Sequence, residues 1–370
     1  MDAIDRWLRD AARPLSDLDA GDAEILLLGE LNHFVHEKSD FRLACASQFA
    51  GQGFETFGEE LGWSDGTRID AFLNARDAAI FERISLFGFT GDARSDRDDR
   101  PRGIFKASLD DYPVSLMRAE QERFYRGLRA KAFFGFDVAA GHDGTYADLT
   151  LLTGTPPRRI TGESLAEEIL RLEKWRAALP PGADPRIGAA VGARIDGLRY
   201  AALVRDAATY EATRPAMAFR EDAMKRRFSD ARSIFPGRTA LMAHAMHLAK
   251  DDNLINAPGA VGPGGRLTPS LGHHIVQELG LKAYAVWMIY GGGEDSQPLK
   301  DLPNKARFPS HTLNARMARL FDRPTVVSLE GAPDVSYAIG HLYNTLFETR
   351  LKAQADAVWF TPKVTPMRLG

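Results

Sequence analysis

The stretch that decides the fold is residues 24–33, which read Glu-Ile-Leu-Leu-Leu-Gly-Glu-Leu-Asn-His. A short continuous apolar run closed by a glycine is typical of a strand that is buried on both faces of a sheet. Glycine also permits a sharp exit from the strand. Residues 24–28 therefore predict a buried central strand, and Gly29 brings Glu30 and His33 to its carboxyl end.

The same unit recurs along the chain. Residues 37–51 predict a helix and residues 54–57 predict the next strand, so the beginning of the chain favours a strand-helix-strand unit whose two strands form a parallel pair. Further short apolar runs predict strands at 131–138, 239–243, 282–290 and 356–360. In open α/β sheets the carboxyl edge of the parallel strands is where ligands bind.

Between these strands the pattern is mostly helical. We expect an α/β protein with a mixed, largely parallel central sheet flanked by helices, in which a helical lobe forms the cleft. The whole chain, residues 1–370, is interpreted as one domain. The helical lobe is expected within residues 64–130, and long helices are expected at residues 163–230.

Composition excludes several classes of protein. The chain is 44% hydrophobic and 26% charged, with a net charge of -3, which does not favour a nucleic-acid-binding protein. No apolar run approaches the roughly 18 residues of a membrane span, and the beginning of the chain does not resemble a signal peptide. Cys45 is the single cysteine, so neither an intramolecular disulfide nor a thiolate metal cluster can form. We therefore expect a cytoplasmic protein whose partner is a small-molecule substrate, with no nucleic acid and no membrane.

The first group that could carry chemistry is Glu30 and His33. A carboxylate three residues from an imidazole can hold it in one tautomer and raise its basicity, which suits a general base. The plainer interpretation is a helix start with a capping glutamate and an incidental histidine. His36 follows at a spacing that could make half of a metal site with His33, although a surface histidine is the favoured interpretation of His36.

Further polar residues follow other predicted strands. His244 and His247 come after strand 239–243, and they are the strongest local signal because two buried imidazoles need several hydrogen-bond partners. Glu60 and Asp137 come near the ends of two more strands, where one carboxylate of the Glu59-Glu60 pair can reach the cleft. The candidate substrate-binding residues at this stage are Asp137 and His273, the latter at a helix start.

The combination of these segments resembles the erythromycin esterase-like family. Residues 28–33 resemble the family's Gly-Glu-x-x-His motif, and Arg42 follows the histidine at the family's spacing. Glu60 and Trp63 resemble its Glu-x-x-Trp segment. Residues 244–247 resemble its His-Asn-x-His segment, with Ala245 in place of the asparagine. Together with weaker similarity at residues 134–137, 220–224, 271–291 and 356–366, the resemblance runs through nearly the whole chain.

The resemblance implies a hydrolase that needs neither a metal nor another cofactor. It implies that His33 activates water as general base and that Glu30 orients the imidazole. It implies that the catalytic site is completed by Arg42, Glu60, His244 and His247. Trp63 then joins Asp137 and His273 as a substrate-binding candidate, and the expected reaction is cleavage of an ester or lactone in a small natural product.

Two other interpretations use the same residues. Two glutamates and up to three histidines could bind zinc or manganese in a metal-dependent hydrolase. Alternatively, the acid/base set could deprotonate carbon and catalyse an elimination or a cyclisation in a biosynthetic pathway. The sequence does not identify the substrate or the oligomeric state.

Overall fold

The computed structural model describes residues 2–77, 114–138, 149, 152–153, 160, 162–205, 211–257, 269–295 and 304–367. The chain divides into two compact units. Unit 1 comprises Met1–Glu55, Asp110–Arg129 and Arg238–Gly370, and unit 2 comprises Thr56–Leu109 and Ala130–Gly237. Much of the region in which the helical lobe is expected, residues 78–113 of the range 64–130, lies outside the described residues.

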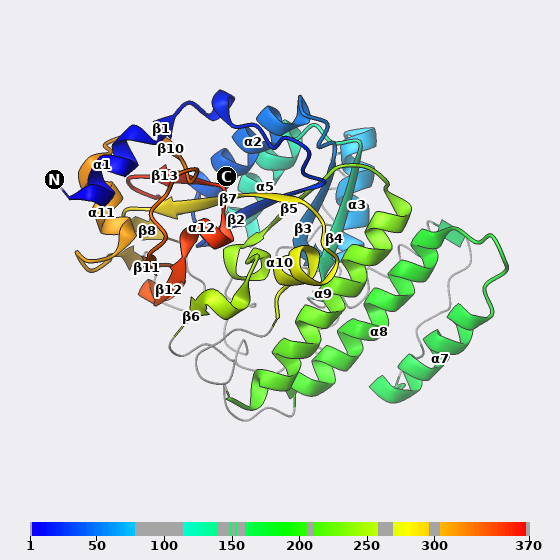
Figure 1. Cartoon of the computed structure of the whole chain (residues 1–370). Helices are drawn as coiled ribbons and strands as arrows, with labels where there is room; N and C mark the ends of the chain where they lie inside the picture. Colours follow the sequence, from blue (N-terminus) through cyan, green and yellow to red (C-terminus); the bar gives the residue numbers. More distant parts are fainter. Residues whose placement is uncertain are drawn as a thin grey trace. The chain divides into compact units, whose positions relative to one another are not determined.

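Unit 1 is built on a twisted sheet with the strand order β1-β10-β13-β7-β2-β5 (Figure 1). Four of these strands run parallel, namely β13 (Ala357–Thr361), β7 (Ala283–Tyr290), β2 (Ile25–Glu30) and β5 (Thr239–His244). The other two, β10 (Thr325–Ser328) and β1 (Ala12–Arg13), are antiparallel to their neighbours. All six residues of β2 are buried, as expected for a strand with a parallel neighbour on each side.

The remaining regular elements of unit 1 are short, apart from two helices of 14 residues. The helices are α1 (Ala3–Asp10), α2 (Glu37–Ala50), α5 (Val114–Gly127), α10 (Leu271–His273, continued by a π-turn at His274–Glu278), α11 (Leu313–Leu320) and α12 (Leu351–Gln354). A three-stranded sheet contains β11 (Ser336–Gly340), β12 (Leu346–Arg350) and β6 (Ile255–Asn256), and a two-stranded sheet contains β8 (Gly293–Asp295) and β9 (Asn304–Ala306). Among the described residues of unit 1, 3₁₀ turns lie at Leu15–Asp17, Ala245–Leu248, Asp252–Leu254 and Leu342–Asn344.

Unit 2 combines one parallel strand pair with long helices. Strand β3 (Thr56–Gly62) pairs with β4 (Ala132–Asp137), and helix α3 (Trp63–Ala75) follows β3 directly. A Cβ atom on Gly66 would lie 1.9 Å from the backbone nitrogen of Gly135, so glycine at this position lets α3 approach β4 at backbone distance.

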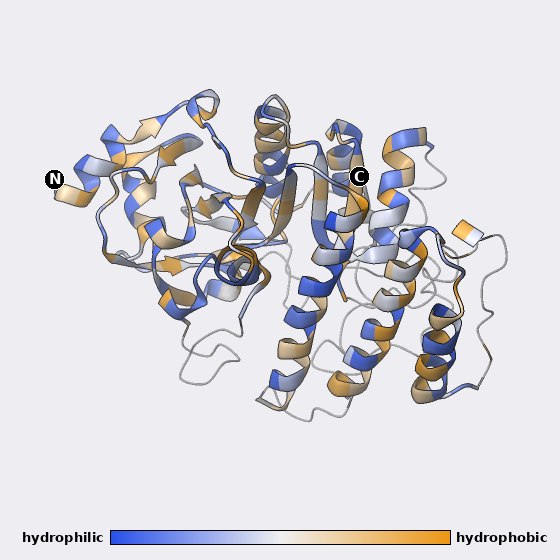
Figure 2. Cartoon of the chain, turned by 45° about the vertical axis from the view of Figure 1, so that its right-hand side comes forward, coloured by the Kyte–Doolittle hydropathy of each residue, from blue (hydrophilic) through white to orange (hydrophobic). Residues whose placement is uncertain are grey.

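The long helices of unit 2 pack against one another in chain order. They are α7 (Leu165–Ala177), α8 (Pro185–Arg205) and α9 (Arg214–Ile234), with a 3₁₀ turn at Glu211–Thr213 before α9. Each carries hydrophobic as well as hydrophilic residues (Figure 2), and α8, which packs against both α7 and α9, is buried over most of its length. A capping box between Ser164 and Glu167 fixes the start of α7.

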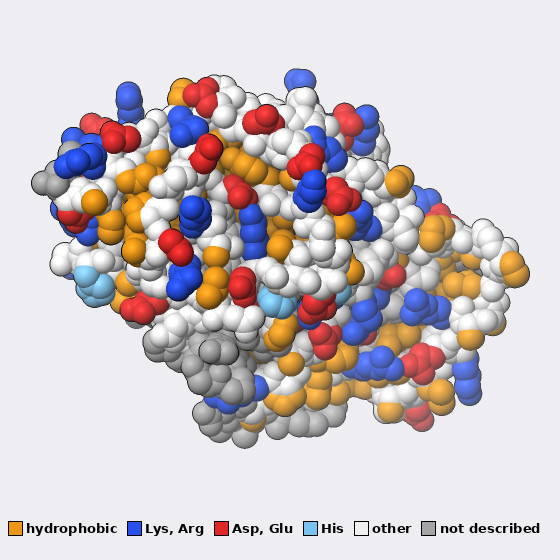
Figure 3. Space-filling model, viewed as in Figure 1, with side chains coloured by type: hydrophobic (Ala, Val, Ile, Leu, Met, Phe, Trp, Pro, Cys, Tyr) orange, Lys and Arg blue, Asp and Glu red, His pale blue; other side chains and the backbone are white. Residues whose placement is uncertain are grey.

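The predicted fold class, α/β with a mixed, largely parallel sheet flanked by helices, is confirmed. The predicted pairing at the beginning of the chain is wrong, because β2 pairs with β5 and β7, whereas β3 pairs with β4. Apolar runs far along the chain flank β2, which local sequence order cannot reveal. Among the described residues, no helix is both long enough and apolar enough to cross a membrane. On the face shown in Figure 3, acidic and basic side chains are intermingled.

Candidate functional site

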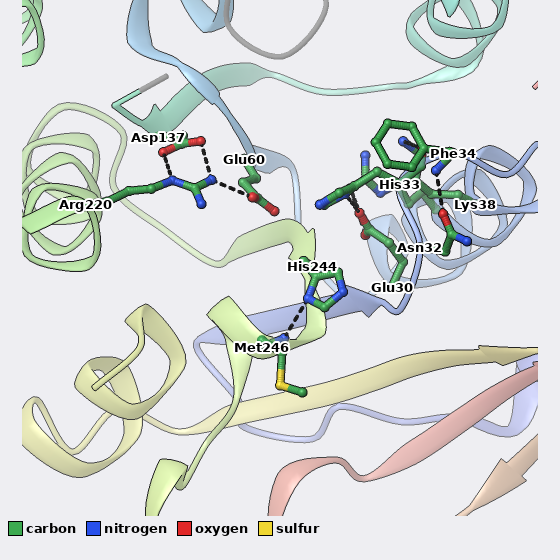
Figure 4. Close-up of polar contacts among 11 residues, drawn as sticks. Glu30, Asn32, His33, Phe34, Lys38, Glu60, Asp137, Arg220, His244 and Met246 are labelled. Atoms are coloured by element: carbon green, nitrogen blue, oxygen red, sulfur yellow. Dashed lines mark hydrogen bonds and ion pairs between the residues drawn. The ribbon is translucent and has the colours of Figure 1, made fainter. Parts of the chain in front are cut away.

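The core of the candidate site in unit 1 is a hydrogen-bonded group of Glu30, His33 and Arg42 (Figure 4 shows the first two). Glu30 is the last residue of β2 and is fully buried. Its two carboxylate oxygens accept hydrogen bonds from Nη2 of Arg42 on α2, at 2.9 and 2.8 Å. The Oε1 atom also lies 2.9 Å from Nδ1 of His33. Strand β2, the turn that follows it and helix α2 therefore each contribute one residue to this group around the buried Glu30 carboxylate.

The charge of Glu30 follows from its neighbours. Burial by itself would raise the pKa of this carboxyl, but the Arg42 guanidinium and the hydrogen bond with His33 outweigh it and lower the pKa to about 2. The carboxylate is thus ionised at neutral pH and can only accept hydrogen bonds. In the neutral imidazole of His33 the proton then lies on Nδ1, which places the lone pair on Nε2.

Three hydrogen bonds hold the turn that contains His33 in place. The Asn32 side chain accepts a hydrogen bond from the Phe34 amide at 2.9 Å and donates to Oδ2 of Asp295 at 2.9 Å. Lys38 Nζ donates to the His33 carbonyl at 2.7 Å. Asn32 and Asp295 are both buried, and the hydrogen bond between them ties the turn to β8 of the two-stranded sheet. His33 itself keeps 23% of its side chain exposed, which leaves it accessible to a substrate.

A second imidazole faces the first. His244 is the last residue of β5, and its ring centroid lies 5.2 Å from that of His33. Its Nδ1 accepts a hydrogen bond from the Met246 amide at 3.3 Å (Figure 4). An acceptor nitrogen in a neutral imidazole requires the proton on the other nitrogen, so Nε2 of His244 is the donor. The pair therefore presents one basic nitrogen, on His33, and one N–H donor, on His244.

Two further histidines adjoin His244. His247 lies in the 3₁₀ turn after β5, with its ring centroid 6.5 Å from that of His244. His341 directly follows β11, and its ring centroid is 5.8 Å from that of His244. His341 is not among the site residues predicted from the sequence. The informative signal, a polar residue at the end of a strand, is present there, but no strand was predicted at 336–340.

In unit 2, an ionic cluster surrounds Arg220 of α9. Arg220 donates through Nε and Nη2 to the two oxygens of Asp137, at 2.8 and 2.6 Å, and through Nη2 to Oε1 of Glu60 at 2.8 Å (Figure 4). Burial would lower the pKa of the guanidinium, but the two carboxylates hold it well above its usual value. Within unit 2, therefore, the predicted site residues Glu60 and Asp137 share a charged partner. Arg220 was not singled out as a site residue from the sequence.

The other predicted residues have diverse surroundings. Trp63 is buried against Phe134 in the core of unit 2, with ring centroids 6.4 Å apart. His273 lies on α10 with Nδ1 at 3.9 Å from Oδ2 of Asp252. The role of Trp63 and of His273 in substrate binding stays a prediction.

The structure corrects the expectation that His36 is a surface histidine. His36 is buried rather than at the surface, with Nδ1 2.6 Å from Oε2 of Glu120 on α5. It also precedes α2, which begins at Glu37, so it shares no helical face with His33. The long-range partner Glu120, 84 residues away, makes burial of a polar ring possible, and no local pattern indicates it.

In the ranges that the structure describes, no group of three or more His, Cys, Asp or Glu side chains is arranged to hold a metal ion. The Glu30 carboxylate is hydrogen-bonded to the imidazole of His33 and to the guanidinium of Arg42.

Comparisons place this architecture among known folds. No protein-family model matches the sequence, and no curated protein matches it. The structure of an erythromycin esterase, a histidine-to-asparagine mutant of EreC in its open conformation, is similar with a TM-score of 0.60 at 16% identity, covering 96% of this chain and 94% of that one. This chain has the erythromycin esterase-like fold.

Two other solved structures share that fold. A succinoglycan biosynthesis protein is similar with a TM-score of 0.69 and a Bacillus cereus protein with a TM-score of 0.68, each at 14% identity and covering 99% of this chain and 98% of the other. The erythromycin esterase-like fold thus carries proteins of more than one description. At these identities the likeness concerns the fold, and the activity has to be argued from the site.

Proposed function

We propose that this protein is a hydrolase that cleaves an ester or lactone bond in a small molecule, with His33 as general base. The observation that carries the proposal is the contact between Nδ1 of His33 and the ionised Glu30 carboxylate, because it leaves Nε2 of His33 as a proton acceptor. The esterase-like fold supports the same class of reaction, since the structural relative EreC is an erythromycin esterase.

In the proposed first step, Nε2 of His33 takes a proton from water as the water oxygen attacks the carbonyl carbon of the substrate. The proton on Nδ1 stays on His33, and its hydrogen bond with Glu30 stabilises the imidazolium that forms. Arg42 keeps the carboxylate ionised and in place. This arrangement provides a base without requiring Glu30 itself to change its protonation.

The negative charge that develops on the carbonyl oxygen needs a donor. His244 Nε2–H is suited to this role because the Met246 amide fixes the tautomer and because the two rings lie 5.2 Å apart. Collapse of the tetrahedral intermediate then breaks the bond to the leaving oxygen, which takes the proton from Nε2 of His33. His247, next to His244, is proposed to complete this part of the site. Glu60 stays a prediction from the sequence.

The test is hydrolysis of p-nitrophenyl acetate and of a panel of lactones in water enriched in ¹⁸O. The expected result is one labelled oxygen in the carboxylate product and a fall in kcat of about 10²–10⁴ in His33→Ala. His311→Ala is the matched control, because His311 is exposed and belongs to no part of the site. Unlabelled product would indicate elimination or cyclisation, and unchanged turnover in His33→Ala would reject His33 as the base.

A further inference from the structure

His341 is a partly buried histidine, and one of its ring nitrogens already has a hydrogen-bond partner. Its Nε2 lies 2.9 Å from the Thr345 hydroxyl oxygen. That hydroxyl has a single proton, which it donates to the Leu342 carbonyl at 2.6 Å. The Thr345 oxygen therefore accepts from His341, and the proton of the ring is on Nε2. This fixes Nδ1 of His341 as a hydrogen-bond acceptor.

The acceptor atom lies inside the protein. Nδ1 of His341 is buried and has no hydrogen-bond partner among the described residues. Burial lowers the pKa of this imidazole to about 4, so the ring remains neutral and the acceptor is kept at neutral pH. A buried acceptor without a protein partner is unfavourable to folding, which makes a ligand donor a natural explanation.

The position of the ring connects it with the proposed chemistry. The His341 ring is tilted by 59° relative to the His244 ring, with 5.8 Å between centroids, and it packs edge-on against Phe347 at 5.3 Å. His244 in turn lies 5.2 Å from His33. The three rings His33, His244 and His341 thus supply a base, a donor and an acceptor in that order, and the His341 ring adjoins the ring proposed to bind the carbonyl oxygen.

We infer that Nδ1 of His341 accepts a hydrogen bond from a hydroxyl group of the substrate, so that the enzyme selects hydroxylated esters or lactones over their deoxy analogues. The inference rests on the proposed hydrolase function and adds the substrate class to it. A methyl ether at the same place would be discriminated against, because it has no proton to donate and needs more room.

The test compares p-nitrophenyl 3-hydroxybutyrate, its 3-methoxy analogue and p-nitrophenyl butyrate by kcat/KM. The wild-type protein is expected to favour the hydroxylated ester by about tenfold or more, which is the discrimination from one such hydrogen bond. The ratio is expected to fall below about threefold in His341→Phe, which fills a similar volume without an acceptor. His341→Asn, whose amide oxygen can replace Nδ1, is expected to retain most of the preference.

Two variants keep the test decisive. Thr345→Val removes the hydroxyl that fixes the tautomer and is expected to weaken the preference even if His341→Phe does not fold. His311→Phe is the matched control at an exposed histidine and is expected to keep the wild-type ratio. Equal rates on all three esters, with His33→Ala inactive, would overturn the role of His341 and leave the hydrolase proposal standing. Absence of hydrolysis of every ester and lactone would overturn both.

Discussion

Glu30 and His244 are Cα partners at the carboxyl ends of the parallel strands β2 and β5. This register explains how residues more than 200 positions apart meet. Glu30 orients His33 from one strand end, and His244 occupies the equivalent place on the next strand, so the two imidazoles come within 5.2 Å between ring centroids. Parallel register thus sets the spacing between the proposed base and the proposed donor.

Replacing the Glu30 carboxylate tests whether catalysis depends on the tautomer of His33. In Glu30→Gln the introduced amide can donate to Nδ1 of His33, which would move the imidazole proton to Nε2 and remove the base. We expect kcat to fall by about 10²–10⁴, with KM changed much less. Steady-state kinetics measure this, and Glu330→Gln, at an exposed glutamate, is the matched control. A Glu30→Gln protein with wild-type kcat would show that the tautomer does not limit the reaction.

Removing the Arg42 guanidinium tests how far this cation stabilises the buried Glu30 carboxylate. Arg42→Met leaves the buried Glu30 without its cation, and we expect a loss of about 3–5 kcal/mol in the free energy of unfolding at pH 7. In the wild type the pKa of Glu30 is lowered to about 2, so its stabilisation is present above the pKa of the unfolded carboxyl and is lost as the pH falls toward 2. In Arg42→Met burial raises that pKa, so the variant should be least stable at high pH.

The double variant Glu30→Gln, Arg42→Met provides the comparison for that prediction. It contains no uncompensated buried charge, so we expect it to be more stable at pH 7 than Arg42→Met alone. Urea denaturation of the wild type, both single variants and the double variant at pH 4 and pH 7 gives the coupling energy. Simple additivity of the two single effects at pH 7 would contradict the ion pair seen between Arg42 and Glu30.

The buried ring of His341 predicts a pH dependence of stability. Its pKa is lowered to about 4, so the unfolded chain takes up a proton from this group at a higher pH than the folded chain does. Stability from this group is therefore complete above about pH 6.5 and is lost as the pH falls toward 4. We expect His341→Asn to lose less stability than the wild type between pH 7 and pH 4.5, measured by urea denaturation. His311→Asn should follow the wild type, and parallel curves for His341→Asn would refute the prediction.

Gly29 precedes Glu30 in β2 and has little room for a side chain. A Cβ atom there would lie 3.0 Å from Cα of Ala245 and 3.0 Å from Cδ1 of Trp287, and both neighbours are fully buried. We expect Gly29→Ala to lower the free energy of unfolding by about 1–3 kcal/mol and to reduce kcat by moving the turn after β5. Thermal unfolding with calorimetry checks the first effect. Gly51→Ala, where the nearest atom is a carbonyl oxygen at 3.6 Å, should change the midpoint little.

The sequence alone determined the class of fold and most of the strand ends that matter. Short apolar runs identified strands β2, β4, β5, β7 and β13 to within a few residues, because strands buried between parallel neighbours must be apolar throughout. The same pattern located Glu30 and His244 at carboxyl ends, where ligands bind in such sheets. The local spacing of Glu30 and His33 likewise predicted their contact, since only one turn of chain separates them.

Only the tertiary structure decided which ends meet and what each polar group contacts. Strand order placed β5 and β7 beside β2, so that His244 at the end of β5 comes to face His33. Burial of His36 depended on Glu120, and the acceptor state of His341 depended on Thr345 and Leu342. The physical reason is that the pKa and the tautomer of a buried group are set by neighbours brought together through folding, whereas a strand is specified by its own apolar residues.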